Sequence, residues 1–145
     1  MRYQTHAVFC IFLSLILFNL IDINSKIWFF SVAIFFSLLP DIDESRSRLG
    51  NKIKPLSYFL KHRGVFHSAW IPLIFIIIFY GVNPELSIAA FLGYASHLVL
   101  DSFTVQGVRF AFPLKFRIRG FMKTGGMIEL ILFVVLVIAI ILLII

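Results

Sequence analysis

The chain has 145 residues, of which 61% are hydrophobic and 14% are charged, whereas soluble domains average about 45–50% apolar and about 25% charged residues. A domain of this size buries the smallest share of its surface, so the composition excludes a soluble globular fold, and it excludes a disordered chain as well. The single cysteine, Cys10, excludes a disulfide framework and a cysteine-based zinc site. We expect the net charge of +6 to report membrane topology rather than nucleic-acid binding.

Five apolar stretches without Asp, Glu, Lys or Arg follow one another, each 14 to 17 residues long. A membrane span needs about 20 residues, so most stretches reach a workable length only by including an ionisable residue at one end. No small-x-small cleavage site follows the first stretch, which we expect to be a retained helix rather than a signal peptide. The sequence predicts an all-α integral membrane protein, one domain over residues 1–145, with about five transmembrane helices at Ala7–Ile21, Ile27–Pro40, Ser68–Pro84, Leu86–Leu100 and Leu130–Ile145.

The basic residues are distributed unevenly between the two faces of such a bundle. If five spans alternate, the amino terminus and the connections 41–63 and 101–128 share one face, which then holds 12 of the 13 Lys and Arg residues. Lys26 alone lies on the other face. Because Lys and Arg in short loops mark the cytoplasmic side, we expect a multi-pass protein of the cytoplasmic membrane, with its amino terminus inside and its carboxyl terminus outside. The predicted partner is the lipid bilayer, without nucleic acid.

The same alternation sorts the ionisable residues near the helix ends. All four histidines fall at the basic face, whereas Asp22 and Glu85 are the acidic residues assigned to the opposite face. We therefore expect one polar cluster at the cytoplasmic face, drawn from His6, Asp41, Asp43, His62, His67, His97, Asp101 and Glu129.

The sequence LPDIDE places two carboxylates directly after the second stretch. Pro40 is expected to end the helix, so that Asp41 and Asp43 follow in extended backbone, where positions two apart point the same way. Two such carboxylates could face one cation or one water molecule. The alternative is that both residues only solubilise a helix end, although carboxylates do not complement the negative end of the helix dipole.

The sequence HRGVFHS carries two histidines that one helix cannot place on one face. His62 and His67 are five residues apart, or about 140° around a helix, and Gly64 between them offers a break. We expect His62 in the loop and His67 in the first turn of the third helix. Arg63 is suited to bind an anion such as a phosphate. Each histidine alone could also be an interfacial polar residue.

The sequence GYASHLVLD places His97 and Asp101 four residues apart, on one face of a helix. This spacing suits two ligands of one metal ion, or a carboxylate that orients a ligating imidazole; a plain His–Asp pair is the alternative. Because His97 lies inside an apolar helix, where a polar group is costly, we favour a functional role. A His, Asp and Glu set without cysteine suits zinc, manganese or iron, as one ion or two.

The motifs together resemble the YdjM-like family of membrane-bound, metal-dependent hydrolases. The matching pieces are His6, Leu39–Asp43 with Leu49–Gly50, His62–Ser68, Gly93–Thr104 and Gly126–Glu129, which cover nearly the whole chain. The resemblance implies an integral membrane protein with a metal-hydrolase assignment. It also implies that the family's histidines and carboxylates correspond to those at the matching positions.

The predicted function is therefore a membrane-bound hydrolase that attacks an ester or phosphoester, of a lipid-linked or phosphorylated substrate, with a metal-activated water. The expected cofactor is a divalent metal ion, zinc in the first instance, with manganese or iron as the alternatives. The rival predictions are a transporter or metal-handling protein, whose polar groups would mark an ion path, and a non-catalytic scaffold. The expected metal ligands are His6, Asp41, His62, His67, His97 and Asp101, and the expected catalytic residues are Asp43 and Glu129 as proton acceptors and Arg63 on the anion.

Overall fold

The computed structural model describes residues 1–43, 65–114 and 116–145, and of residues 42, 43 and 65 it describes the backbone alone. This part of the chain is all-helical, as predicted, and its β-structure is limited to isolated bridges of Thr104 with Met122 and of Val108 with Ile118. The elements are the α-helices α1 (Tyr3–Phe18), α2 (Lys26–Leu38), α4 (Trp70–Tyr80), α5 (Pro84–Ser102) and α6 (Met127–Ile144), and the 3-10 helices η1 (Leu39–Asp43) and η3 (Val65–His67).

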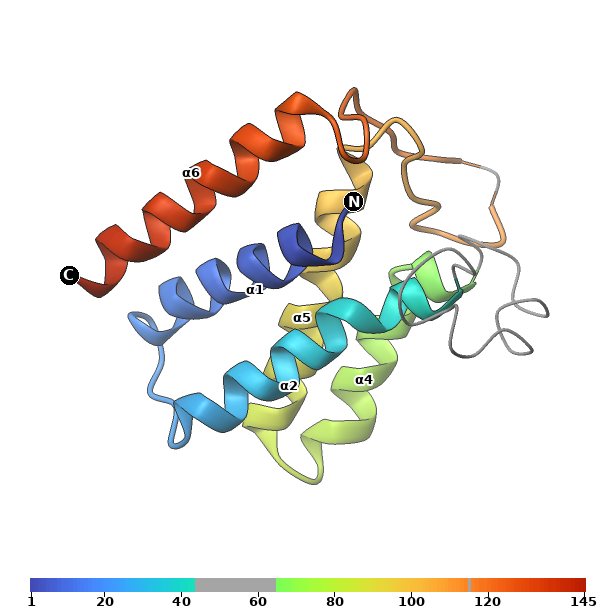
Figure 1. Cartoon of the computed structure of the whole chain (residues 1–145). Helices are drawn as coiled ribbons and strands as arrows, with labels where there is room; N and C mark the ends of the chain where they lie inside the picture. The colour runs from blue at the N-terminus through green and yellow to red at the C-terminus, as the bar shows by residue number, and fades with distance from the viewer. Residues whose placement is uncertain (44–64, 115) are drawn as a thin grey trace.

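Helix α5 occupies the centre of the bundle (Figure 1). It contacts α1, α2 and α4, while α1 also contacts α2 and α6. Helices α1 and α6 lie side by side and both start at the end where the amino terminus lies. The end of α5 lies there as well, because Asp101 and Glu129 both contact the first residues of the chain.

Gly93 allows α5 to approach the backbone of α2. A β-carbon at Gly93 would collide with the carbonyl oxygen of Ala33 and would lie 3.0 Å from the backbone nitrogen of Ser37. Around this contact Ala33, Ala90 and Tyr94 are fully buried in the apolar core. The close approach places the last turn of α2 beside the turn of α5 that carries the histidine of the GYASHLVLD motif.

Helix α4 is shorter than the predicted helix Ser68–Pro84. It ends at Tyr80, because Asn83 precedes a proline and leaves the helical conformation to cap α5. The Asn83 Oδ1 atom accepts hydrogen bonds from the backbone nitrogens of Glu85 (2.8 Å) and Leu86 (3.1 Å), and Pro84 takes the first helical position. The turn between α4 and α5 is thus fixed by short-range chemistry.

Helix α6 is the best candidate for a membrane span. Its 18 residues have a mean hydropathy of 3.4, and only 11% of them are buried inside the protein. Among the described residues it is the one helix whose length and composition suffice to cross a membrane. Helix α4, with 11 residues, is roughly 16 Å long, against a hydrocarbon core of about 30 Å. The count of five spans stays a prediction.

The connection between α5 and α6 packs against the start of α4. The backbone nitrogen of Ala69 donates to the carbonyl oxygen of Phe110 (2.9 Å), and Trp70 Nε1 donates to that of Phe112 (3.0 Å). Gly107 lies at φ +63°, where a β-carbon would also collide with the carbonyl oxygen of Ile118. This connection therefore holds the segment next to His67 from outside the helices.

Candidate metal centre

His97 is fully buried on α5, and its orientation is fixed by α2. Its Nδ1 atom lies 2.7 Å from the carbonyl oxygen of Ser37. Because a carbonyl oxygen only accepts hydrogen bonds, Nδ1 must carry the proton. In the neutral ring Nε2 then keeps its lone pair, as a metal-ligating imidazole requires.

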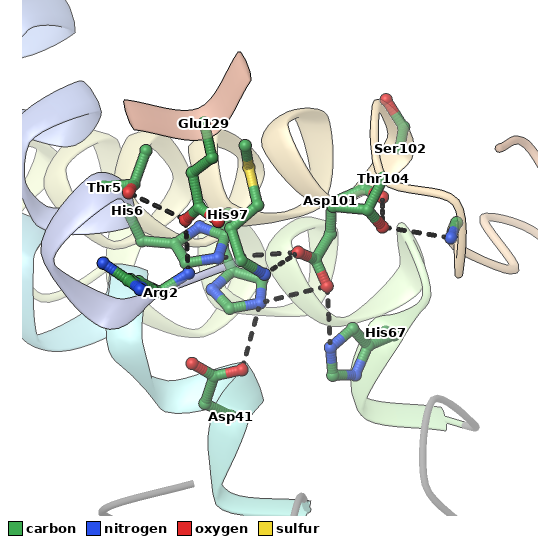
Figure 2. Close-up of polar contacts among 12 residues, drawn as sticks. Arg2, Thr5, His6, Asp41, His67, His97, Asp101, Ser102, Thr104 and Glu129 are labelled. Carbon is green, nitrogen blue, oxygen red and sulfur yellow. Dashed lines mark hydrogen bonds and ion pairs between the residues drawn. The ribbon is translucent and has the colours of Figure 1, made fainter. Parts of the chain in front are cut away.

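The carboxylate of Asp101, one turn further along α5, lies among three imidazoles (Figure 2). Its oxygens are 3.5 Å from His6 Nε2, 3.7 Å from His67 Nε2 and 3.9 Å from His97 Nε2. The amino group of Met1 also donates to Asp101 Oδ1 over 2.8 Å. Residues from α1, η3 and α5 thus meet at one buried carboxylate, which is 1% exposed.

Asp41 approaches the same centre from the end of α2. Its Oδ1 atom lies 3.7 Å from His97 Nε2, and its side chain keeps 13% exposure. The expectation of extended backbone after Pro40 is wrong, because Leu39–Asp43 continues α2 as a 3-10 helix. A 3-10 helix has three residues per turn, so the extended geometry on which the pairing of Asp41 and Asp43 was based is absent here. Burial raises the pKa of the Asp41 carboxyl above its ordinary value.

His67 lies in η3, directly before α4, and not in the first turn of that helix as expected. A buried tyrosine positions this segment: the hydroxyl of Tyr94 donates to the carbonyl oxygen of Phe66 over 2.6 Å. Tyr94 precedes His97 by three residues, so both side chains lie on one face of α5. The same helix face therefore supplies His97 and holds the neighbour of His67.

His6 completes the cluster from the first turns of α1. Its ring stacks on the ring of His97, with centroids 3.9 Å apart and planes 10° from parallel. Both nitrogens of His6 and Nε2 of His97 are buried and form no hydrogen bond within the described structure, although the two Nε2 atoms lie 3.5–3.9 Å from carboxylate oxygens. Buried polar atoms in folded proteins almost always have partners. Unpartnered nitrogens at this point indicate a group that the side chains themselves do not supply.

The donor set fits a divalent transition metal. Ligand atoms of His6, Asp41 and His97 lie within 4.8 Å of one another, and so do those of His67, His97 and Asp101. Imidazole nitrogens and carboxylate oxygens are ligands that zinc, iron and manganese accept. Since His97 belongs to both groups, the five side chains could surround one ion or two neighbouring ions.

Glu129 lies beside this cluster but belongs to neither of the two groups. It accepts hydrogen bonds from the backbone nitrogen of Arg2 (2.6 Å), the hydroxyl of Thr5 (2.9 Å) and the backbone nitrogen of Gly125 (2.5 Å). The carboxylate therefore fastens the start of α6 to the start of α1. Its contact with the backbone nitrogen of Arg2 is adjacent in the chain to the contact of the Met1 amino group with Asp101.

The remaining predicted site residues are not placed by the structure. His62 and Arg63 lie outside the described residues, as does the side chain of Asp43. The sequence interpretation also missed Ser37, Tyr94 and Thr5, which contact His97, the Phe66 carbonyl and Glu129 respectively. A signal was present for Tyr94, since it lies on the helical face of His97; for the Ser37 carbonyl the sequence offers none.

A family model and curated relatives match this chain. The family model described as "YdjM inner membrane protein" matches residues 1–145. YvsG of Bacillus subtilis (strain 168) is 38% identical over 101 residues, or 64% of this chain and 63% of that protein. The inner membrane protein YdjM of Escherichia coli (strain K12) is 35% identical over 98 residues, or 60% of this chain and 50% of that protein.

The chain thus matches between one half and two thirds of the length of these curated relatives. No solved structure matches the chain. The name of the Escherichia coli relative places that protein in the inner membrane, in agreement with the apolar, exposed helix α6. The match over all 145 residues makes this protein a member of the YdjM inner membrane protein family.

Proposed function

We propose that this protein is a metal-dependent hydrolase of the cytoplasmic membrane, which cleaves an ester or phosphoester of a lipid-linked or phosphorylated substrate. The proposal rests on one observation above others. Buried nitrogens of His6 and His97 lack a hydrogen-bond partner among the described residues and lie within reach of the carboxylates of Asp41 and Asp101. A divalent ion, zinc in the first instance, would satisfy them and would supply a water molecule made acidic enough to attack near neutral pH.

In this proposal each side chain has a separate task. His6, Asp41, His67, His97 and Asp101 would hold the ion, and His62 is proposed as a further ligand. The Ser37 carbonyl fixes the ring of His97, as the outer partners of ligating histidines do. Glu129 is the proposed proton acceptor, because its three donors leave one of roughly four lone-pair sites open. Asp43 is the second candidate for that task, and Arg63 is proposed to bind the substrate's anion.

The membrane topology proposed for this reaction is five spans with the amino terminus inside. Twelve of 13 basic residues then lie on the face that holds the cluster, which favours an anionic substrate at headgroup depth. Many large apolar side chains of α6 are exposed, among them Ile131, Val135 and Leu142. Such a surface is stable in lipid and unfavourable in water.

The scaffold alternative is less well supported. A polar cluster that only joins helices is expected to satisfy its own hydrogen bonds, whereas His6 and His97 keep unpartnered nitrogens within the described structure. The transporter alternative draws on the buried hydroxyls of Ser14, Ser37 and Ser96 in the helix interfaces. Each of these hydroxyls donates to a carbonyl oxygen of its own helix, so none needs a transported ion as partner.

Elemental analysis of the purified protein in detergent tests the proposal. We expect about one or two zinc, manganese or iron ions per chain, lost on chelation. A panel of carboxyl esters, phosphomonoesters and phosphodiesters should then reveal hydrolysis that chelation abolishes and the same metal restores. Protein that binds no such metal would overturn the proposal, and metal uptake with flux into liposomes but without hydrolysis would favour the transporter.

A further inference from the structure

A second polar site adjoins the metal cluster between the first turns of α1 and α6. A cavity of about 140 Å³ lies there, and its walls differ in character. Arg2, which caps α1, lines it together with Gln4 and Thr5 of that helix, and Leu130 and Phe133 line it from α6. We call the part lined by Arg2, Gln4 and Thr5 its cationic end, because these side chains are basic or polar, and the part lined by Leu130 and Phe133 its apolar end.

The cationic end is the guanidinium of Arg2. This side chain is exposed, and no carboxylate of the described residues forms an ion pair with it. It lies over Gly125, since a β-carbon at that glycine would be 3.4 Å from Arg2 Nη2. The Glu129 carboxylate also lines the cavity, but it is 2% exposed and accepts three hydrogen bonds, so the guanidinium is the group that faces an incoming ligand.

The apolar end belongs to the helix that is best suited to cross the membrane. Leu130 is 53% exposed, and α6 turns most of its surface away from the protein. A guanidinium binds phosphate through parallel N–H donors, and an acyl chain gains by contact with such an apolar helix face. A phospholipid carries both an anionic phosphate and an apolar chain, the two parts that this lining suits.

We propose that this cavity binds the phosphate group of a phospholipid, with an acyl chain directed along Leu130 and Phe133. The inference rests on the proposed function, for which it specifies the substrate class. The cavity is suitably placed, because the carboxylates of Asp101 and Glu129 accept hydrogen bonds from the adjacent nitrogens of Met1 and Arg2. A phosphate bound at Arg2 would thus lie next to the metal cluster.

The test measures binding of radiolabelled dioctanoyl phosphatidate to the full chain in dodecyl maltoside, which carries no phosphate, with a chelator present. The matched variants are Arg2→Gln and, outside the cavity, Arg119→Gln. We expect the first to raise the dissociation constant about tenfold, because it removes a charged hydrogen-bond donor, and the second to change it less than about twofold. Equal effects of both variants would mean unspecific charge attraction and would overturn the proposal.

Competition identifies which part of the lipid is recognised. Dioctanoylglycerol has the same chains without the phosphate, and inorganic phosphate has no chains, so both should compete at least about tenfold more weakly than phosphatidate. Competition by either as strong as that of phosphatidate would refute phospholipid binding. At the apolar end, Phe133→Ala should weaken phosphatidate binding. Val134→Ala should not, because this neighbouring side chain is outside the lining. This pair keeps the test valid if Arg2→Gln fails to fold.

The two proposals fail separately because the chelator removes metal from the binding assay. Phosphatidate binding at Arg2 without any hydrolysis would support the cavity and count against the hydrolase. Metal-dependent hydrolysis of a soluble phosphoester, with no phosphatidate binding, would overturn the cavity and leave the hydrolase standing.

Discussion

The imidazole rings of His6 and His97 stack with their centroids 3.9 Å apart, and they join α1 to α5 where both helices meet the metal cluster. The sequence separates these residues by 91 positions. The stacking therefore brings imidazoles from two distant segments of the chain beside the carboxylates of Asp41 and Asp101.

His97→Ala should remove most bound metal, because His97 belongs to both groups of ligand atoms. Glu85→Ala is the matched control on the same helix, since Glu85 lies at the opposite end of α5 and binds Asn24. The measurement is metal content per chain after purification. Equal retention of metal by the two variants would count against His97 as a ligand and against the proposed mechanism.

Gly93→Ala should destabilise the protein by about 1–3 kcal/mol, because its β-carbon would collide with the carbonyl oxygen of Ala33. Gly81→Ala is the control, since a β-carbon at Gly81 has no atom within 4 Å. Thermal unfolding in detergent measures both. Gly93→Ala should also bind metal less tightly, because it moves Ser37 away from His97. A stable variant with normal metal content would contradict the packing described for α2 and α5.

Tyr94→Phe should weaken metal binding about 10–100-fold without unfolding the protein, as loss of an outer partner does in metal sites. The change removes the hydroxyl that holds the carbonyl oxygen of Phe66, next to His67. Tyr80→Phe is the control, because Tyr80 is 66% exposed. Metal affinity by competition with a chromogenic chelator separates the outcomes, and unchanged affinity in Tyr94→Phe would show that η3 is positioned by other contacts.

Asp41→Asn should stabilise the metal-free protein at neutral pH while it weakens metal binding. Burial raises the pKa of Asp41 above 3.8, so the metal-free folded state binds this proton more readily than the unfolded state. The stability from this group is present at acid pH and is lost as the pH rises from 3.8 through the raised value. The free energy of unfolding of Asp41→Asn should therefore exceed that of the unchanged protein above this pH range, and the difference should vanish below it.

Unfolding of the chelator-treated protein across a pH series tests this prediction. The exposed Asp22→Asn serves as the control, and no comparable change is expected for it. A stability difference for Asp41→Asn that grew toward acid pH would have the wrong sign for a carboxyl whose charged form is destabilised by burial.

Reporters fused to the two ends test the membrane topology. An odd number of spans places the amino terminus inside and the carboxyl terminus outside, in accordance with the 12 basic residues on one face. A reporter active only in the cytoplasm should then work at the amino terminus, and one active only outside should work at the carboxyl terminus. Both termini on the same side would require an even number of spans.

Local patterns in the sequence were sufficient to predict the helices and most members of the metal cluster. Hydropathy depends on each segment alone, and His97 and Asp101 share a helix face because of their spacing. Alternation of helices then predicted that His6, Asp41 and His67 would lie at the same end, and the structure brings these five side chains together. The membrane-protein class likewise follows from composition, because no fold of this size could bury so much apolar surface.

Only the tertiary structure decided how each ligand is oriented. Three features depend on which backbone atoms become neighbours when α5 packs on α2 and η3. They are the 3-10 turn at Asp41, the contact of the Ser37 carbonyl with His97 and the contact of the Tyr94 hydroxyl with Phe66. That approach is possible because Gly93 has no side chain. Hydrogen bonds of buried groups are fixed by such non-local contacts, which no spacing along the chain encodes, and so the sequence could name the ligands but not the groups that aim them.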